Sequence, residues 1–186
     1  MQKLKILAIV GSLRKESFNL KLALVAKEII GDKADFEILD YKDVPLMNQD
    51  IEYPAPESVK KVREKVKTAN GIWFFTPEYN HFFPGVLKNL IDWLSRPISD
   101  KEPQVLGGKP AAISGITPGM TGTSVAQDHL VTLISFLNMD IMNRPRLTIP
   151  TALQKVDELG VLSLLDSTPY LEKQVDEFIR FIERRK

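Results

Sequence analysis

The stretch LKILAIVGSLRKESFN, residues 4–19, changes from apolar to polar at Gly11. Its first half, Leu4–Val10, is rich in Ile, Leu and Val, which is typical of a central strand in a parallel sheet, where both faces are buried. Gly11 permits a tight exit from such a strand because it has no Cβ. A turn needs only one or two residues of this kind, so the longer polar run that follows indicates a loop that holds a ligand.

Working outward from this stretch, apolar runs alternate with segments of helical length. Further strands are expected at Phe36–Leu39, Gly71–Thr76 and Lys109–Ser114, with Asp140–Arg146 leading into a fifth. Helices are expected at Ser17–Ile30, Glu57–Ala69, Pro84–Leu94, Thr123–Leu137 and Tyr170–Arg184. This alternation predicts an α/β fold, a doubly wound five-stranded parallel sheet of order 2-1-3-4-5 with helices on both faces. We find no internal repeat or linker, so residues 1–186 are expected to form one domain.

Composition excludes several function classes. The 186 residues hold 25 Lys and Arg against 24 Asp and Glu, a net charge of +1, which gives no electrostatic reason to expect nucleic acid or an anionic membrane as a partner. Without cysteine, disulfides, thiolate catalysis and thiolate metal sites are excluded, and we expect no metal. The run Leu4–Val10 is too short for a membrane span or a signal-peptide core, so we expect a cytoplasmic protein.

In a sheet of this order, a ligand is expected beyond the carboxyl ends of the first, third and fourth strands. Three unusual loops follow these strands, namely Gly11–Asn19, Pro77–Pro84 and Gly115–Gly122. Each loop has to be judged against a simpler structural role, since serines cap helices and glycines make turns.

The first loop favours a phosphate group. Ser12, Ser17 and Asn19 supply short polar donors, Arg14 supplies a planar guanidinium, and the helix that follows points its free N–H groups to the same place. The alternative is that Ser17 only caps the helix and Arg14 only faces solvent. The loop has neither the GxxxxGK[ST] nor the GxGxxG pattern, so we expect a ligand held through one terminal phosphate.

The second loop favours a flat heteroaromatic ring. Four rings crowd this loop, those of Tyr79, His81, Phe82 and Phe83, beside the polar side chains of Glu78 and Asn80. This combination suits a ring that needs an apolar face and hydrogen bonds along its rim. One of Phe82 and Phe83 is expected to be ordinary core, and His81 is not assigned to catalysis. In the third loop, glycines at 115, 119 and 122 let bare backbone approach the other side of the ring.

Two of these segments carry a family resemblance. GSLRKESFN, residues 11–19, resembles the GSxRxxSxN signature of the NADPH-dependent FMN reductase family, and PEYNHFFPGVLKNLIDW, residues 77–93, resembles its PEYNxxxPGxLKNxIDW segment. The segment Ser114–Gly122 is similar to the family's third motif. The family includes flavin, quinone, azo-dye and chromate reductases, so the resemblance implies a flavodoxin-like fold that binds FMN.

The resemblance also implies site residues and an assembly. The phosphate and ribityl side would match Ser12, Arg14, Ser17, Asn19 and Leu20; the isoalloxazine loop would match Pro77, Glu78, Tyr79 and Asn80; the third contact would match Ser114 and Gly115. Members are commonly dimers or tetramers, so we expect a homodimer. The segment TSVAQDHL, residues 123–130, lacks the arginine and tyrosine associated with tetramer contacts in some relatives, which argues against a tetramer without excluding it.

The expected reaction is ping-pong hydride transfer from NADPH or NADH to N5 of FMN, and then to a flavin, quinone or similar small acceptor. The cofactor carries the electron chemistry, so no catalytic side chain is predicted. The alternative is a flavodoxin-type electron carrier without NAD(P)H turnover, but such carriers are usually strongly acidic. A phosphorylated receiver on the same fold ranks lower, because the carboxylates it requires after the first and third strands are missing.

Overall fold

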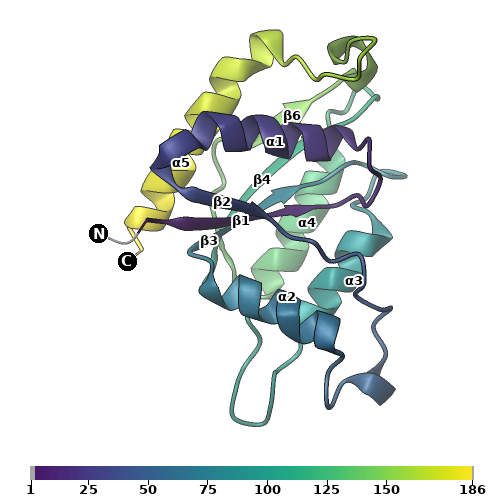
Figure 1. Cartoon of the computed structure of the whole chain (residues 1–186), viewed down its shortest axis with the longest axis vertical. Helices are drawn as coiled ribbons and strands as arrows, with labels where there is room; N and C mark the ends of the chain where they lie inside the picture. Colours follow the sequence, from purple (N-terminus) through teal and green to yellow (C-terminus); the bar gives the residue numbers. More distant parts are fainter. Residues whose placement is uncertain (1–2, 186) are drawn as a thin grey trace.

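A parallel sheet forms the centre of the protein in a computed structural model that describes residues 3–185. Its strands lie in the order β2-β1-β3-β4-β5, which confirms the predicted order (Figure 1). The strands are β1 (Lys5–Val10), β2 (Asp35–Ile38), β3 (Gly71–Phe75), β4 (Pro110–Ile116), β5 (Asp140–Ile141) and β6 (Leu147–Ile149), of which β6 also pairs with β4.

Helices cover both faces of this sheet, as predicted. They are α1 (Phe18–Ile30), α2 (Glu57–Thr68), α3 (Gly85–Leu94), α4 (Ser124–Phe136) and α5 (Thr168–Glu183). Helices α1 and α5 pack on one face, while α2, α3 and α4 pack on the other (Figure 1). No helix within residues 3–185 combines the length and the apolar character that crossing a membrane requires.

The fifth strand position differs from the expectation, in which Asp140–Arg146 leads into a single strand. Two short strands share this side of β4 instead: β5 pairs with its beginning and β6 with its end. Pro145 lies between them and has no N–H to donate to a ladder. The side-chain amide of Gln174, on α5, donates to the carbonyls of Ile113 and Pro145 at 2.9 Å each, and so links the sheet to the interrupted position.

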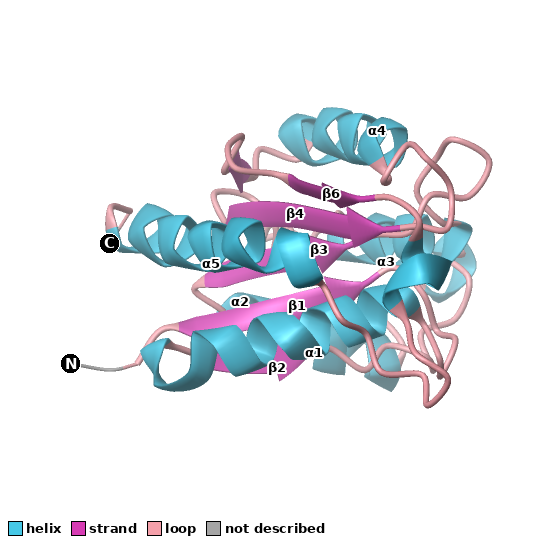
Figure 2. Ribbon diagram, turned by 90° about the horizontal axis from the view of Figure 1, so that it is seen from above, coloured by secondary structure: helices cyan, strands magenta, loops and turns pink. Residues whose placement is uncertain are grey.

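The core explains why β3 lies at the centre of the sheet. All five of its residues are buried, and Trp73 stacks on Phe75 with ring centroids 5.3 Å apart. A Cβ at Gly71 would lie 2.6 Å from Ile182 and 2.9 Å from Phe178, so only glycine allows α5 to pack this closely. Because the strands are parallel, their carboxyl ends lie at the same edge of the sheet, where the three loops gather (Figure 2).

Candidate functional site

The first loop leaves β1 beside the end of β3, its neighbour in the sheet. The Gly11 N–H donates to the Phe75 carbonyl at 2.8 Å. A Cβ at Gly11 would lie 3.1 Å from Pro77 and 3.3 Å from Leu87, a spacing tighter than most such contacts. The first and second predicted loops therefore begin in direct contact, which places both at the same end of the site.

Helix α1 begins at this loop with the expected cap. The buried Ser17 hydroxyl accepts from the Leu20 N–H at 3.4 Å, which leaves other first-turn N–H groups free, as in every α-helix. Arg14 is exposed, and its guanidinium carbon lies 5.2 Å from the centre of the Phe18 ring. Capping by Ser17 is thus observed and is compatible with an anion at the helix start. Ser12, in the same loop, is half-buried, and its hydroxyl accepts from the Arg14 N–H at 3.4 Å.

Asn19 has a different place from the one its motif suggests. Its side-chain amide donates to the Ile116 carbonyl at 2.9 Å, and its side-chain oxygen accepts from the Ile116 N–H at 3.1 Å. The side chain is buried, so it docks α1 onto the end of β4. Contact between Asn19 and a cofactor stays a prediction, and the observed role is to hold the first loop beside the third.

The second loop contains a tight turn. Tyr79 and Phe82 exchange backbone hydrogen bonds of 2.9 and 3.0 Å, while Asn80 and His81 have φ values of 53° and 60°. Two successive positive φ values are the signature of a type I′ turn. Within residues 3–185, the backbone N–H groups of Asn80 and His81 have no recorded acceptor, so both remain free to bind a ligand.

The aromatic residues of this loop divide as expected. Phe83 is buried in the core, whereas Tyr79 is 53% and Phe82 is 42% exposed. The Phe82 ring lies 4.6 Å from the His129 ring on α4. The turn therefore presents two aromatic side chains at the carboxyl edge while Phe83 anchors it.

Glu78 joins the second loop to the third. Its carboxylate accepts from the Thr121 hydroxyl at 2.7 Å and from the Ala126 N–H at 3.1 Å, in the first turn of α4. The His81 Nδ1 lies 3.5 Å away. Only 6% of the Glu78 side chain is exposed. The observed function of this carboxylate is therefore to fix two loops together, and the neighbouring backbone is left to meet a ligand.

The third loop follows a crowded strand end. The Ser114 hydroxyl is fully buried, accepts from the Trp73 indole at 2.9 Å and donates to Gln174 at 2.6 Å. At Gly115, a Cβ would overlap the Thr76 carbonyl oxygen and the Thr123 hydroxyl. The Ser114 side chain thus belongs to the core, while Gly115, still within β4, lets the Thr76 carbonyl and the Thr123 side chain approach its backbone closely.

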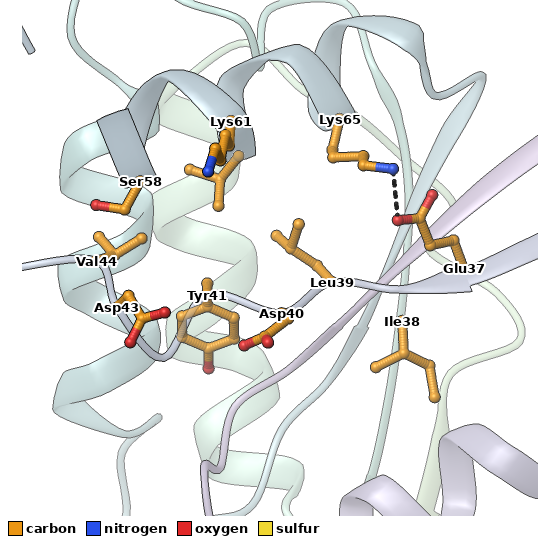
Figure 3. Close-up of a pocket in the computed structure, with 11 residues that line it drawn as sticks. Glu37, Ile38, Leu39, Asp40, Tyr41, Asp43, Val44, Ser58, Lys61 and Lys65 are labelled. Carbon is orange, nitrogen blue, oxygen red and sulfur yellow. Dashed lines mark ion pairs between the residues drawn. The ribbon is translucent and has the colours of Figure 1, made fainter. Parts of the chain in front are cut away.

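A separate cleft of about 440 Å³ lies between β2 and α2 (Figure 3). Lys65 reaches across it to Glu37 at 2.9 Å. Tyr41 lines the cleft, and its hydroxyl donates to the Val10 carbonyl at 2.5 Å. Burial raises the pKa of Tyr41, so the phenol remains a neutral donor that supports the end of β1. None of the predicted site residues lines this cleft.

The predicted residues thus form two groups. The structure brings the first loop, the turn at Tyr79–Phe82 and the third loop to one edge, where Pro77 is buried and Leu20 is half-buried behind the exposed residues. The side chains of Asn19 and Ser114 point into the core instead. Sequence reasoning did not identify Thr121 or Lys21, because their partners are far away along the chain.

A parallel sheet of this order, with its irregular loops at the carboxyl edge, defines the class as a flavodoxin-like α/β protein. The sequence model of the NADPH-dependent FMN reductases matches residues 4–154. The chain is 36% identical over 183 residues to a 2-hydroxy-1,4-benzoquinone reductase from Burkholderia sp, covering 98% of both proteins. It is 35% identical over 189 residues to a quinone reductase from Escherichia coli K12, covering 100% of this chain and 98% of that protein.

A solved structure agrees with these relatives. The flavoenzyme FerB, an NAD(P)H:(acceptor) oxidoreductase from Paracoccus denitrificans, superimposes with a TM-score of 0.88 at 32% identity, covering 99% of each chain. The chain belongs to the NADPH-dependent FMN reductase family. It is an oxidoreductase that uses FMN and NAD(P)H, which confirms the class of enzyme and the cofactors expected from its two motifs.

Proposed function

We propose that the protein transfers a hydride from NAD(P)H, by way of FMN, to a quinone or similar small acceptor in two separate half-reactions. When bound, FMN supplies the redox chemistry, since N5 of its ring can accept a hydride and pass it on. Reduction of a quinone to a hydroquinone then consumes this hydride and one proton. The side chains of the protein bind and orient the reactants.

The carboxyl edge fits a phosphate ester joined to a planar ring. At one end, the free N–H groups of the first turn of α1 and the exposed Arg14 guanidinium favour an anion. At the other end, the turn presents the rings of Tyr79 and Phe82 and the free backbone donors of Asn80 and His81. These donors match a ring with acceptors along its rim, as flavin has.

Glu78 orients this end of the site without taking part in proton transfer. Its carboxylate is already bonded to Thr121 and Ala126, so the turn is fixed before a ligand arrives. A turn that is ordered in advance loses less entropy on binding. The exposed aromatic side chains beside it leave one side open to solvent, where NAD(P)H and the acceptor would bind in turn.

The observation that carries this proposal is the meeting of the three loops at one edge, with the cationic helix start and the aromatic turn as its two ends. A quinone is the proposed acceptor because two relatives that match nearly full-length are named for quinone substrates. An open aromatic surface selects acceptors by shape and apolar contact rather than by specific hydrogen bonds.

A homodimer forms part of the proposal. Phe136 on α4 is 86% exposed, and Tyr79 and Phe82 are exposed beside the same helix. A second copy that packs on Phe136 and on the edge of this aromatic group would form one wall of the ring end and leave its other side open to NAD(P)H and the acceptor. Size-exclusion chromatography with light scattering tests this assembly, and a mass of about one chain at micromolar concentration would contradict it.

The function is tested by anaerobic spectroscopy. The purified protein is incubated with FMN, freed of unbound cofactor, and then given one equivalent of NADPH followed by one of 1,4-benzoquinone. The flavin absorbance should disappear with NADPH and return with the quinone, and steady-state plots should show the parallel lines of a ping-pong reaction. Bound flavin that accepts electrons only from a partner reductase would instead identify an electron carrier.

A further inference from the structure

A short hairpin lies between β6 and α5 and is ordered by its own contacts. Val156 pairs with Leu162 across it, and the Asp157 carboxylate accepts from the N–H groups of Leu159 and Val161 at 3.0 and 2.8 Å. Gly160 lies at its tip with a φ of +78°, which favours glycine. The hairpin therefore keeps one shape and can serve as a fixed support.

Lys21 connects this hairpin to the first loop. Its ammonium donates to the Gly160 carbonyl at 2.6 Å and lies 2.7 Å from the Glu16 carboxylate. The Lys21 side chain is only 17% exposed, although it belongs to the second turn of α1. One cation thus holds together two segments separated by 139 positions of sequence.

The first loop has few other supports. Residues 13–16 are all exposed. Within residues 3–185, their recorded hydrogen bonds and ion pairs are local to the loop except for the one from Glu16 to Lys21. Without this link, the middle of the loop would be held only by its two ends.

The link also matters for charge. Glu16 stands in the loop that is proposed to hold a phosphate, and its carboxylate would repel an anion. The hydrogen bond from the Lys21 ammonium holds the pKa of Glu16 below its usual value, so Glu16 stays ionised, and the adjacent positive charge offsets its negative charge. Lys21 therefore orders the loop and counterbalances the negative charge of Glu16 at the same time.

We infer that Lys21 is a positioning residue, which clamps the Gly11–Ser17 loop against the Gly160 hairpin and so prepares the loop for the phosphate group of the cofactor. This inference rests on the proposed function. Lys21 is not proposed to contact the ligand. It affects ligand binding through Glu16 and through the backbone of the loop.

The first test compares two flavins. Lys21→Met keeps the length of the side chain and removes its charge. We expect it to raise the dissociation constant of FMN about fivefold, the effect of losing one hydrogen bond of about 1 kcal/mol, and to change that of riboflavin, which has no phosphate, less than about twofold. Lys21→Arg should restore most of the FMN affinity. Equal losses for both flavins, or no loss for either, would overturn the inference.

The second test needs no flavin. Hydrogen exchange of residues 157–163 is measured in the unloaded protein, where Lys21→Met should make the hairpin amides exchange faster. Glu16→Gln should leave these amides protected, because the bond from Lys21 to Gly160 remains. Lys33→Met is the matched control, since Lys33 only pairs with the exposed Asp176. Unchanged exchange in Lys21→Met would refute the clamp.

The two tests separate the two hypotheses. If the wild-type protein does not bind FMN but Lys21→Met loosens the hairpin, the proposed function fails and the clamp on the loop stands. If FMN binds normally and the hairpin does not respond, the clamp fails and the proposed function stands.

Discussion

The two ends of the carboxyl edge are held in different ways. The loops after β3 and β4 are bonded directly to each other by Glu78, whose side chain is almost buried. The loop after β1 has four consecutive exposed residues and reaches its neighbour through the charged side chain of Lys21. The ring end is thus fixed by crowded backbone and a buried carboxylate, whereas the phosphate end combines the buried Asn19 at the start of α1 with a partly exposed ion pair at the middle of its loop.

This difference indicates that the two ends have different roles in the proposed site, one in orienting a ring and the other in binding a phosphate group. A ring must lie at a defined angle for hydride transfer, so the loops around it gain from being rigid before binding. The phosphate end is formed by an exposed loop that adds little to the core, so its side chains act mainly on the ligand. Changes at the ring end should therefore affect the fold, and changes at the phosphate end should affect mainly binding.

The largest effect is expected from Gly115→Ala. The new methyl group would overlap the Thr76 carbonyl and the Thr123 hydroxyl, and because backbone cannot move aside easily, the free energy of unfolding should fall by about 3 kcal/mol. Urea unfolding measures this loss. Gly119→Ala is the control, since within residues 3–185 no heavy atom beyond its own and those of its chain neighbours lies within 4 Å of the added Cβ. Equal stability of the two variants would contradict a rigid ring end.

Arg14→Ala should act on binding alone. Loss of a hydrogen bond to a charged group should weaken FMN by about 1.5–3 kcal/mol, and the free energy of unfolding should barely change because Arg14 is exposed. Titration calorimetry with FMN and with riboflavin measures the effect. Lys15→Ala, its exposed neighbour, is the control. Unchanged FMN affinity in Arg14→Ala would remove this side chain from the phosphate site.

Glu78→Ala should show an intermediate effect at the ring end. Removing its carboxylate leaves the Ala126 N–H without its acceptor, at a cost to stability of about 1.5 kcal/mol. Glu78→Gln keeps an oxygen that can accept this bond and should lose less than half as much. Thermal unfolding of both variants tests the comparison. A Gln variant as unstable as the Ala variant would show that the negative charge matters, and not the bond.

The smallest effect is expected from His81→Ala. The His81 side chain is 76% exposed, and the proposed reaction uses no side-chain acid at this position. Stopped-flow reduction of bound FMN by NADPH should proceed at nearly the wild-type rate, because loss of a true general acid would slow it about a hundredfold or more. A slowing of that size, with FMN still bound, would assign His81 a catalytic role.

The strands and helices were predicted because each depends on local pattern, and the strand order because their alternation is typical of the doubly wound class. β1, β3 and β4 are apolar runs, and α1 begins at a serine cap, so periodicity and capping were sufficient. The divided fifth position was not predicted, since Pro145 interrupts it and a side chain from α5 bridges the gap. No local pattern indicates that bridge.

The candidate site shows the same distinction between features set by local sequence and features set by distant partners. The cap at Ser17, the simpler alternative for that residue, follows from residue type, whereas the turn at Asn80–His81 was expected only as part of a loop. The partners of Ser114 and Asn19 are 60 and 97 positions away, and only the folded chain brings them together. Their types suggest polar contact with a ligand, yet their side chains bond within the core. Sequence indicated which loops matter and could not say which atoms of each loop face outward.

The hydrogen bonds between Asn19 and Ile116 determine how the docking of α1 depends on pH. A carboxamide has no proton to gain or lose near neutral pH, so the docking of α1 onto β4 has the same strength in mild acid and mild base. The ion pair between Lys21 and Glu16 differs, because the Glu16 carboxylate can gain a proton in acid, although the hydrogen bond from Lys21 holds its pKa below the usual value. Strong acid can therefore loosen the first loop while the helix that begins at the phosphate end stays in register with the sheet.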